Sequence, residues 1–224
     1  MKTKVKICGI CSLEDVRVLN EAGPDFAGFV LAPSKRRVKL EELETLIAYL
    51  DPKIIPVGVF VNQDPAYLLQ AVAVGIRVLQ IHGDESPGYI QELRSLLDRQ
   101  NSGKIKIWKA VRIGLENEID KADREFQGLV DGIIVDKYDS NAYGGTGQAF
   151  DWNLLRKKHE SQEGERWDFP LILAGGLNED NVKLAISTVN PYCVDVSSGV
   201  ETNGRKDRMK IRRFIEQLRQ CSRL

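Results

Sequence analysis

The chain has 224 residues, of which 42% are apolar and 29% charged, and its formal net charge is zero. A chain of this size can bury a substantial core, and about 200–250 residues is a common length for an α/β barrel that forms one domain. The balanced charge, without a long run of one sign, gives no reason to expect nucleic acid or a membrane surface as a partner. The basic tail 205–223 is interrupted by apolar residues, so we expect an amphipathic helix there instead of a nucleic-acid arm.

The sequence carries no targeting or membrane signal that we can identify. No stretch of about 18 apolar residues occurs, and the first residues enter a strand-like pattern without the features of a signal peptide. The four cysteines lack the spacing of a disulfide framework, which fits a reducing compartment. We therefore expect a cytoplasmic protein that does not span a membrane.

Short β-branched runs alternate with helical patterns from the first residues onward. The runs expected as strands lie at 4–8, 26–31, 54–60, 78–82, 105–111, 132–136, 171–174 and 194–197. Several are continuously apolar, as is typical of parallel strands covered on both faces. Between them, apolar residues recur at helical spacing, most clearly at 40–50, 89–97 and 211–218.

Helix starts are marked by capping residues. Ser12 with Asp15 three residues later predicts one N-cap, and Asp64 before Pro65 predicts another. The polar segment 156–168 is expected to be a short helix and a surface loop.

Eight such units in one chain without a linker predict the α/β class and a closed (β/α)₈ or TIM barrel, as a single domain spanning residues 1–224. An open nucleotide-binding sheet would usually carry a glycine fingerprint after its first strand, and Gly9 alone does not make one.

In a barrel of this kind the functional groups lie at the carboxyl ends of the strands and in the loops that follow. Polar or glycine residues are expected there after most of the strands, and they should converge on one rim: Cys8, 33–37, Asn62, Gln80, His82, Asp136, Gly175, Gly176, Asp195, Ser197, Ser198 and Gly199.

The loops after the last two strands predict a phosphate site. Gly175-Gly176 and Ser198-Gly199 offer backbone N–H groups with little side-chain obstruction, and the same pair of loops commonly holds phosphate in barrels. The glycines could instead serve only tight turns, but two such loops in barrel register favour phosphate. A third glycine-rich stretch, 144–147, could close over the ligand.

Cys8 is the first candidate for chemistry. Together with Cys11 it forms a C-x-x-C pair, yet no second pair follows and the only histidines are His82 and His159, so zinc or redox chemistry is disfavoured. A buried structural cysteine is the ordinary interpretation of a lone thiol. Cys8 differs because it is predicted to end a strand at the functional rim.

Asp136 is the second candidate. It ends an apolar strand, where partial desolvation favours the neutral carboxyl form and suits a proton donor. The alternative is a salt bridge with Lys109 or Lys137. For His82, catalysis and a hydrogen bond across the barrel mouth remain equally open.

The assembled residues resemble the phosphoribosylanthranilate isomerase family of tryptophan biosynthesis. The matching segments follow one another over nearly the whole chain: 6–10, 28–30, 34–36, 57–62, 79–83, Asp136, 144–147, 150–152, 174–177, 181–182, 194–201, 206–207 and 210–211. Each segment alone is a short motif; their shared order makes the resemblance strong.

The resemblance implies an Amadori rearrangement that needs neither a metal nor a redox cofactor, acting on a small phosphorylated substrate. Cys8 matches the general base that removes the C2′ proton, and Asp136 the general acid that protonates the furanose ring oxygen. Arg36 matches the residue that engages the anthranilate moiety. The other matched positions imply contacts to phosphate (Gly175, Gly176, Ser198 and Gly199) and a place near the sugar (His82 and Asp195).

Cys11 stands where the family pattern leads us to expect threonine. This departure suggests the hypothesis that oxidation could trap Cys8 through Cys11.

Two other functions compete with this assignment. One is the related histidine-pathway isomerase, which uses two carboxylates, so that Cys8 argues against it. The other is a non-catalytic barrel that binds a phosphorylated ligand, which the joint presence of Cys8, Asp136 and Arg36 disfavours. A monomer and a homodimer are both compatible with the sequence.

Overall fold

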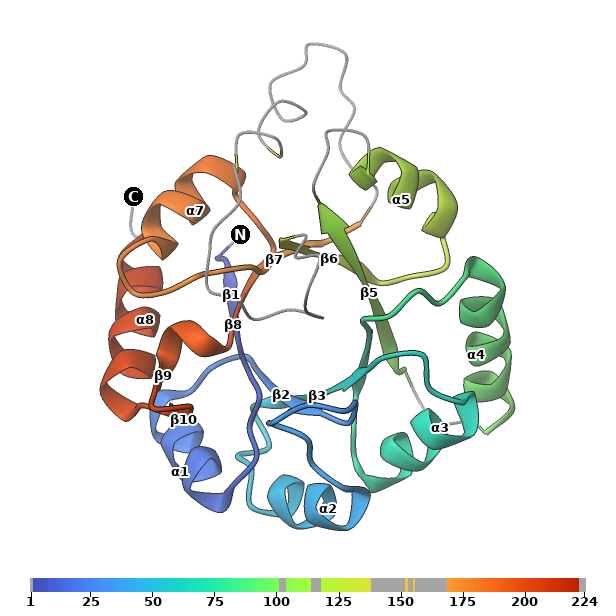
Figure 1. Ribbon diagram of the computed structural model, residues 1–224, viewed down its shortest axis with the longest axis horizontal. Helices are drawn as coiled ribbons and strands as arrows, with labels where there is room; N and C mark the ends of the chain where they lie inside the picture. Colours follow the sequence, from blue (N-terminus) through green and yellow to red (C-terminus); the bar gives the residue numbers. More distant parts are fainter. Residues whose placement is uncertain are drawn as a thin grey trace.

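The computed structural model describes residues 2–100, 104–113, 118–137, 152, 155 and 169–221. Eight parallel strands hydrogen-bond in chain order and β8 closes on β1, which confirms the predicted barrel (Figure 1). The strands are β1 (Lys4–Cys8), β2 (Phe26–Val30), β3 (Ile55–Phe60), β4 (Val78–Ile81), β5 (Lys106–Ile113), β6 (Gly132–Lys137), β7 (Leu171–Leu173) and β8 (Cys193–Val196).

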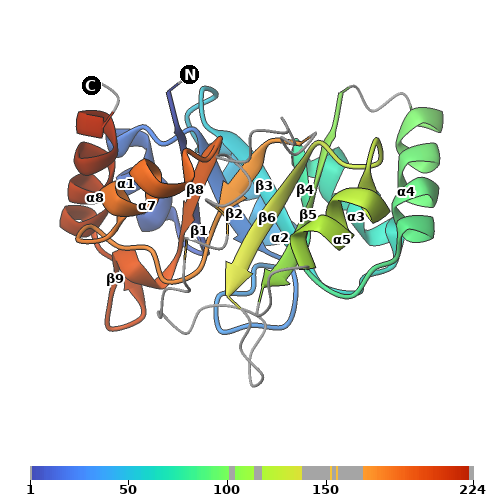
Figure 2. The ribbon, with the colours of Figure 1, turned by 90° about the horizontal axis from the view of Figure 1, so that it is seen from above.

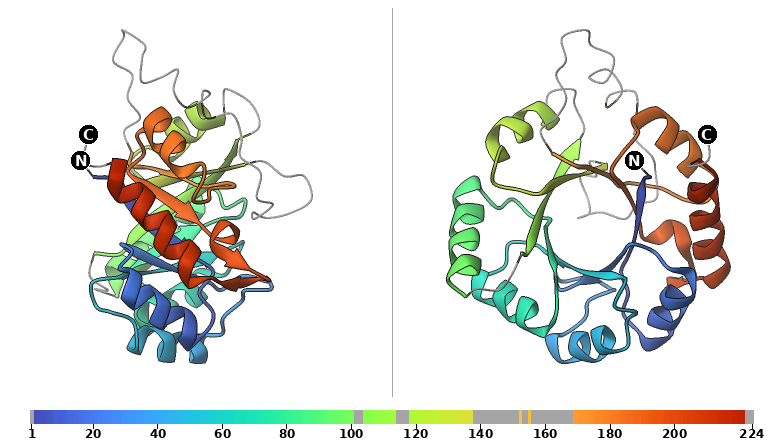
Figure 3. Two further views of the ribbon diagram at one scale, coloured as in Figure 1. Left: turned by 90° about the vertical axis from the view of Figure 1, so that its left-hand side faces the viewer. Right: turned by 180° about the vertical axis from the view of Figure 1, so that it is seen from behind.

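Helices surround this ring on the outside, as the views from the front and from behind both show (Figures 1 and 3). They are α1 (Leu13–Ala22), α2 (Leu40–Ala48), α3 (Pro65–Val74), α4 (Pro87–Arg99), α5 (Glu118–Phe126), α7 (Val182–Val189) and α8 (Arg208–Cys221). A short 3₁₀ turn, η1 (Ser198–Val200), follows β8. The predicted glycine-rich stretch 144–147 and the predicted segment 156–168 lie outside the described residues.

The predicted helix caps are confirmed. The Ser12 hydroxyl accepts a hydrogen bond from the Asp15 backbone N–H, and the Asp15 carboxylate accepts one from the Ser12 N–H, which makes a capping box at the start of α1. At α3 the Asp64 carboxylate accepts from the Ala66 N–H, and Pro65 occupies the first helical turn, where a missing N–H costs nothing.

The predicted helix in the basic tail is wrong at its start. Strand β10 (Arg205–Lys206) pairs with β9 (Glu201–Thr202) as an antiparallel hairpin, and α8 begins only at Arg208. The two turn residues, Asn203 and Gly204, have φ of 53° and 75°. Asn-Gly favours this left-handed pair, whose twist matches that of the hairpin strands.

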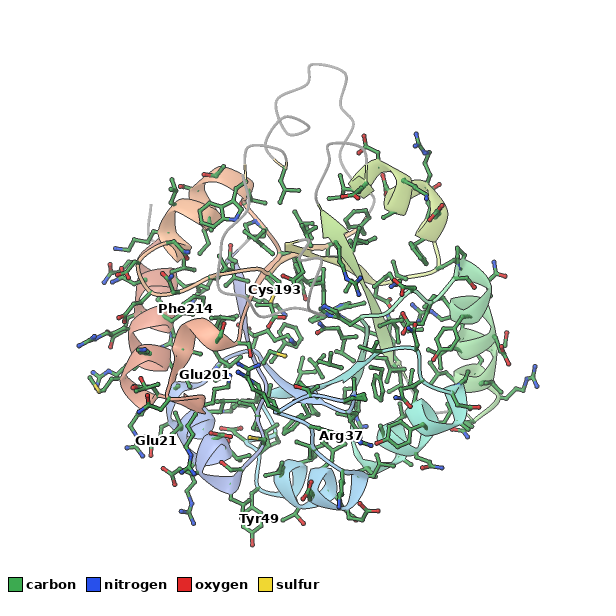
Figure 4. All side chains as sticks on the ribbon, in the orientation of Figure 1. Glu21, Arg37, Tyr49, Cys193, Glu201 and Phe214 are labelled. Carbon is green, nitrogen blue, oxygen red and sulfur yellow. The ribbon has the colours of Figure 1, made fainter. Side chains whose placement is uncertain are left out.

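Alternate residues of each strand point into the barrel, and these inner side chains form a core of their own. Phe26, Trp108, Ile134, Ile172 and Cys193 belong to this inner cluster, and Cys193 is labelled inside the ring in Figure 4. The same period of two carries Cys8, two residues beyond Lys6, and His82, two beyond Gln80, to the inner side of the mouth.

The strands end together on one face. In the view from above, the loops that follow the strand arrows gather on one side, and α8 ends on the opposite side, where β1 begins (Figure 2). Among the described residues, no helix is long and apolar enough to cross a membrane.

The inner core sets a testable stability requirement. Trp108 is 1% exposed and its ring meets Phe26 edge-on, with centroids 4.9 Å apart. We expect Trp108→Ala to lower the free energy of unfolding by about 3–5 kcal/mol, because it leaves a cavity inside the barrel. Urea unfolding followed by circular dichroism measures this.

A matched aromatic control lies on the surface. Tyr49 is 66% exposed and points away from the barrel in Figure 4. Tyr49→Ala should stay within about 0.5 kcal/mol of the parent. An equal loss of unfolding free energy in the two variants would contradict the contribution of Trp108 to the inner core.

Candidate active site

A pocket of about 900 Å³, including its solvent-filled mouth, opens at the carboxyl ends of the strands. The structure brings every residue of the predicted site to its lining: Cys8, Arg36, His82, Asp136, Gly175, Gly176, Asp195, Ser198 and Gly199. These residues come from β1, β6, β8 and the loops after β2, β4, β7 and β8, so closure of the barrel is what brings them together.

Cys8 lies above a buried ion pair. The Lys6 side chain is fully buried, and its Nζ lies 2.9 Å from both carboxylate oxygens of Asp195. Burial raises the pKa of the Cys8 thiol, and the Lys6 charge opposes this rise. Asp195, which we placed near the sugar, therefore has a protein partner in the structure.

Asp136 lies opposite His82, and of the two lysines that we considered as its partners the Lys137 side chain lies outside the described residues. The His82 Nε2 is 3.6 Å from the Asp136 Oδ2, and both side chains are almost buried. Lys109 is directed elsewhere, since its Nζ donates to the Gly83 carbonyl at 2.7 Å and lies 3.4 Å from Glu85.

Gln80 orients the His82 ring. The Gln80 amide nitrogen is 2.9 Å from His82 Nδ1. An amide N–H donated to Nδ1 leaves the imidazole proton on Nε2, the nitrogen that faces Asp136. The hydrogen bond of His82 thus runs back to Gln80 on β4, and a contact at 3.6 Å, longer than a hydrogen bond, separates its other nitrogen from the Asp136 carboxyl group.

Arg36 is fixed by a carboxylate on β9, the short strand that follows β8 and η1. Its Nε and Nη2 each lie 2.7 Å from an oxygen of Glu201, and Lys206 Nζ is also 2.7 Å from Glu201. Burial opposes the charge on Glu201, but the hydrogen bonds from Arg36 and Lys206 lower its pKa to about 2. Lys206 also donates to the Ser197 carbonyl, and the Ser197 hydroxyl donates to the Cys8 carbonyl.

The two glycine loops are held close together. A Cβ atom on Gly199 would lie 1.9 Å from the Leu177 carbonyl oxygen, so the loop after β8 can approach the loop after β7 only without a side chain there. The Asn181 amide donates to the Gly176 carbonyl at 2.9 Å, which fixes the loop at the start of α7. Gly175 and Gly176 have φ of 86° and 68°, the left-handed region that glycine adopts without strain.

Cys11 is exposed and its thiol lies 3.6 Å from the Asp15 carboxylate. Burial and the Asp15 charge raise the pKa of Cys11, so that its thiolate is disfavoured. Cys8, Cys11 and Cys193 are free thiols. The described residues also contain no group of His, Cys, Asp and Glu that could hold a metal ion.

Sequence reasoning missed three residues that support the site. Lys6 could have been found, because it is two residues before Cys8 on the same strand and must share its inward face. Glu201 and Lys206 gave no signal of this kind, since the contacts of Glu201 with Arg36 and Lys206 depend on a hairpin whose second strand we interpreted as helix.

The ionised Glu201 makes a testable contribution to stability. Its folded-state pKa of about 2 lies below the ordinary value of 4.5, so its stabilising effect is fully present above pH 4.5 and is lost as the pH falls toward 2. We expect Glu201→Gln to lower the free energy of unfolding near neutrality and to approach the parent in acid. Urea unfolding between pH 7 and pH 3 measures the difference.

Glu14 provides the control, because its side chain is 65% exposed. Glu14→Gln should differ little from the parent at any of these pH values. A difference between Glu201→Gln and the parent that does not change with pH would contradict the assignment.

Comparison with known proteins places the chain in a family. Residues 5–217 match the family described as N-(5'-phosphoribosyl)anthranilate (PRA) isomerase. An N-(5'-phosphoribosyl)anthranilate isomerase of Thermoanaerobacter sp. (strain X514) is 44% identical over 217 residues, which cover 96% of this chain and 98% of the relative.

Solved structures of similar proteins support the same family assignment. The crystal structure of phosphoribosyl anthranilate isomerase from Thermotoga maritima superposes with a TM-score of 0.82 at 34% identity and covers 97% of this chain and 99% of its own. Another crystal structure of phosphoribosyl anthranilate isomerase, in complex with reduced 1-(o-carboxyphenylamino)-1-deoxyribulose 5-phosphate, has a TM-score of 0.78, 34% identity and the same coverage. The chain therefore belongs to the N-(5'-phosphoribosyl)anthranilate isomerase family, whose members are enzymes of tryptophan biosynthesis.

Proposed function

We propose that this chain converts N-(5'-phosphoribosyl)anthranilate to 1-(2-carboxyphenylamino)-1-deoxyribulose 5-phosphate by an Amadori rearrangement, with Cys8 as general base and Asp136 as general acid. The observation that carries the proposal is the single pocket into which β1 presents a thiol, β6 a carboxyl group and the loops after β7 and β8 their glycines.

The acid acts first. Asp136 gives its proton to the furanose ring oxygen, the bond from that oxygen to C1′ breaks, and the anthranilate nitrogen becomes a cationic Schiff base. The nearly buried position of Asp136 beside His82 suits a proton transfer shielded from bulk water.

The base acts second. The cationic nitrogen acidifies the C–H bond at C2′, the Cys8 thiolate takes that proton, and the electron pair of the bond neutralises the nitrogen. The resulting enolamine tautomerises to the ketone. The reaction moves protons within one substrate, so its chemistry calls for no redox cofactor.

Binding groups hold the substrate across the pocket. Glu201 occupies the Nε and Nη2 edge of Arg36, and the guanidinium has five donors, so its other edge can face the anthranilate carboxylate. The backbone N–H groups around Gly176 and Gly199 suit the phosphate. Fixing both ends of the substrate presents its C2′ proton to the sulfur.

Cys8→Ala and Asp136→Asn test the two chemical roles. Each should lower kcat by about 10²- to 10⁴-fold, the range for loss of one acid or base. The fluorescence of phosphoribosylanthranilate reports its consumption. Cys11→Ser, a thiol loss outside the proposed chemistry, is the matched control and should retain activity.

An inactive wild-type chain would overturn the proposal and favour a barrel that binds a phosphorylated ligand without turnover. Turnover of the histidine-pathway substrate at a greater rate would favour the other isomerase. Full activity in Cys8→Ala would remove Cys8 as the base while leaving the substrate assignment intact.

Gly199→Ala tests the proposed phosphate loops. The added Cβ would collide with the Leu177 carbonyl and separate the two loops. We expect KM to rise about tenfold or more, as loss of a hydrogen bond to a charged group would produce. A substrate analogue without the phosphate should bind both proteins equally.

Gly88→Ala is the control for this substitution. The nearest atom to a Cβ on Gly88 is the Ser86 hydroxyl oxygen at 3.7 Å, an ordinary contact in α4. Its KM should not change. An equal rise in KM for both glycine variants would point to a general loss of structure instead of a phosphate site.

A further inference from the structure

The Lys6–Asp195 ion pair is buried deeper than any substrate contact requires. Lys6 is fully buried, and its neighbour in register across the β1–β8 pairing is Asp195, whose two oxygens it contacts at 2.9 Å. Two charges in such a place cost desolvation energy, and a pair of apolar residues would usually be no less stable. A purely structural role therefore explains this pair poorly.

The pair lies next to the sulfur of Cys8. A Cβ atom built on Gly28 of β2 would lie 2.8 Å from Cys8 Sγ and 3.0 Å from Lys6 Nζ. Both atoms thus border the same small space, which glycine leaves open. The ammonium group is therefore a direct neighbour of the thiol.

The charges that face Cys8 come from several elements and differ in sign. Lys6 on β1 and Lys206 on β10 favour the thiolate, and Asp195 on β8 opposes it. Arg36, in the loop after β2, lines the same pocket as Cys8, and a thiolate on Cys8 raises the pKa of Arg36. Arg36 and Lys206 share the single carboxylate of Glu201, and Lys6 is the cation that lowers the pKa of Cys8 most strongly.

Lys6 keeps its charge in this position. Burial lowers the pKa of its ammonium group, but Asp195 and Cys8 together raise it above the ordinary value. Asp195 thus has two effects on Cys8, since it holds a cation beside the sulfur and adds a negative charge of its own.

We propose that Lys6 and Asp195 form a positioning pair that sets the ionisation of Cys8, with Lys6 stabilising the thiolate and Asp195 limiting that stabilisation. The inference rests on the proposed function of Cys8 as the base. A base must ionise and must also remain basic enough to take a proton from carbon, since the strength of a base falls with its pKa. After the proton transfer the thiol is neutral, and Asp195 still compensates the Lys6 charge.

The two members of the pair should therefore act in opposite directions, which gives the test. We use the rate of Cys8 alkylation by iodoacetamide, a neutral reagent, as a function of pH in the absence of substrate. The background is Cys11→Ser, because Cys11 and Cys8 share one tryptic peptide, and mass spectrometry quantifies that peptide.

Lys6→Met should move the midpoint of the alkylation profile to higher pH and slow the reaction about tenfold at neutral pH, the effect of one pKa unit on the thiolate fraction. Asp195→Asn should move the midpoint to lower pH and accelerate the reaction by a similar factor. The pH profile of kcat/KM should shift in the same two directions.

The double variant Lys6→Met/Asp195→Asn removes both charges and should fold, since no buried charge is left unpaired. Circular dichroism checks each protein. If Lys6→Met alone does not fold, Asp195→Asn and the double variant carry the test, and the double variant should alkylate more slowly than Asp195→Asn.

The inference would be overturned if the midpoint of the alkylation profile moved in the same direction in both single variants, or did not move in Asp195→Asn. The pair would then have only a structural role. Because alkylation needs no turnover, this result is separate from the tests of the proposed function. The substrate assignment fails if the wild type is inactive or prefers the histidine-pathway substrate, and the role of Cys8 as base fails if Cys8→Ala remains fully active.

Discussion

Closure of a parallel barrel is the constraint on which the rest of this structure depends. Each of the eight strands points alternate side chains inward, and every strand ends at the same face. Below the mouth the inward positions are filled by an apolar cluster that includes Trp108 and Phe26. Nearer the mouth, the same alternation places Lys6, Cys8 and Asp195 side by side, because β1 is hydrogen-bonded to β8.

The loops at the mouth are fixed by charge instead of by apolar packing. Glu201 accepts from Arg36 and Lys206, and Lys206 continues the network to Ser197, which in turn contacts the end of β1. This network joins the loop after β2 to the loop after β8 over the end of β1, which lies between those two strands. Under the proposed function, a substrate carboxylate would meet a guanidinium whose orientation is already set, and it would not have to order a mobile side chain.

Much of the fold could be read from the sequence because it follows from local patterns. Apolar runs marked the strands, and Ser12 and Asp64 marked helix starts, where the hydrogen bonds are formed within a few residues. The rim residues were predictable for the same reason, because a residue at a strand's end must lie at the mouth. The sequence does not reveal the hydrogen-bond partners of these rim residues. Nothing near Arg36 indicates that it will bind Glu201, which is 165 residues away.

The hairpin 201–206 illustrates where local reading failed. Basic and apolar residues from 205 onward fit a helix, yet Asn203-Gly204 provides the turn that a hairpin needs, and Asp207 then starts α8 by accepting from the Met209 and Lys210 N–H groups. Our interpretation followed the helical periodicity and did not use the Asn203-Gly204 turn signal. This error affected the description of the site, since the hairpin carries Glu201, which pairs with Arg36.

The apolar cluster inside the barrel and the Lys6–Asp195 pair next to it both affect the ionisation of Cys8. Trp108 and its neighbours exclude water from the barrel beneath Lys6, and in such surroundings a single charge acts over several ångströms with little screening. The same exclusion raises the pKa of the Cys8 thiol and also of Cys193, which lies deeper in the barrel, in register with Lys4. Two cysteines thus lie inside one barrel, and only Cys8 lines the pocket and lies beside the Lys6 ammonium group. Position relative to that cation, more than the thiol itself, is what distinguishes the proposed base from a core residue here.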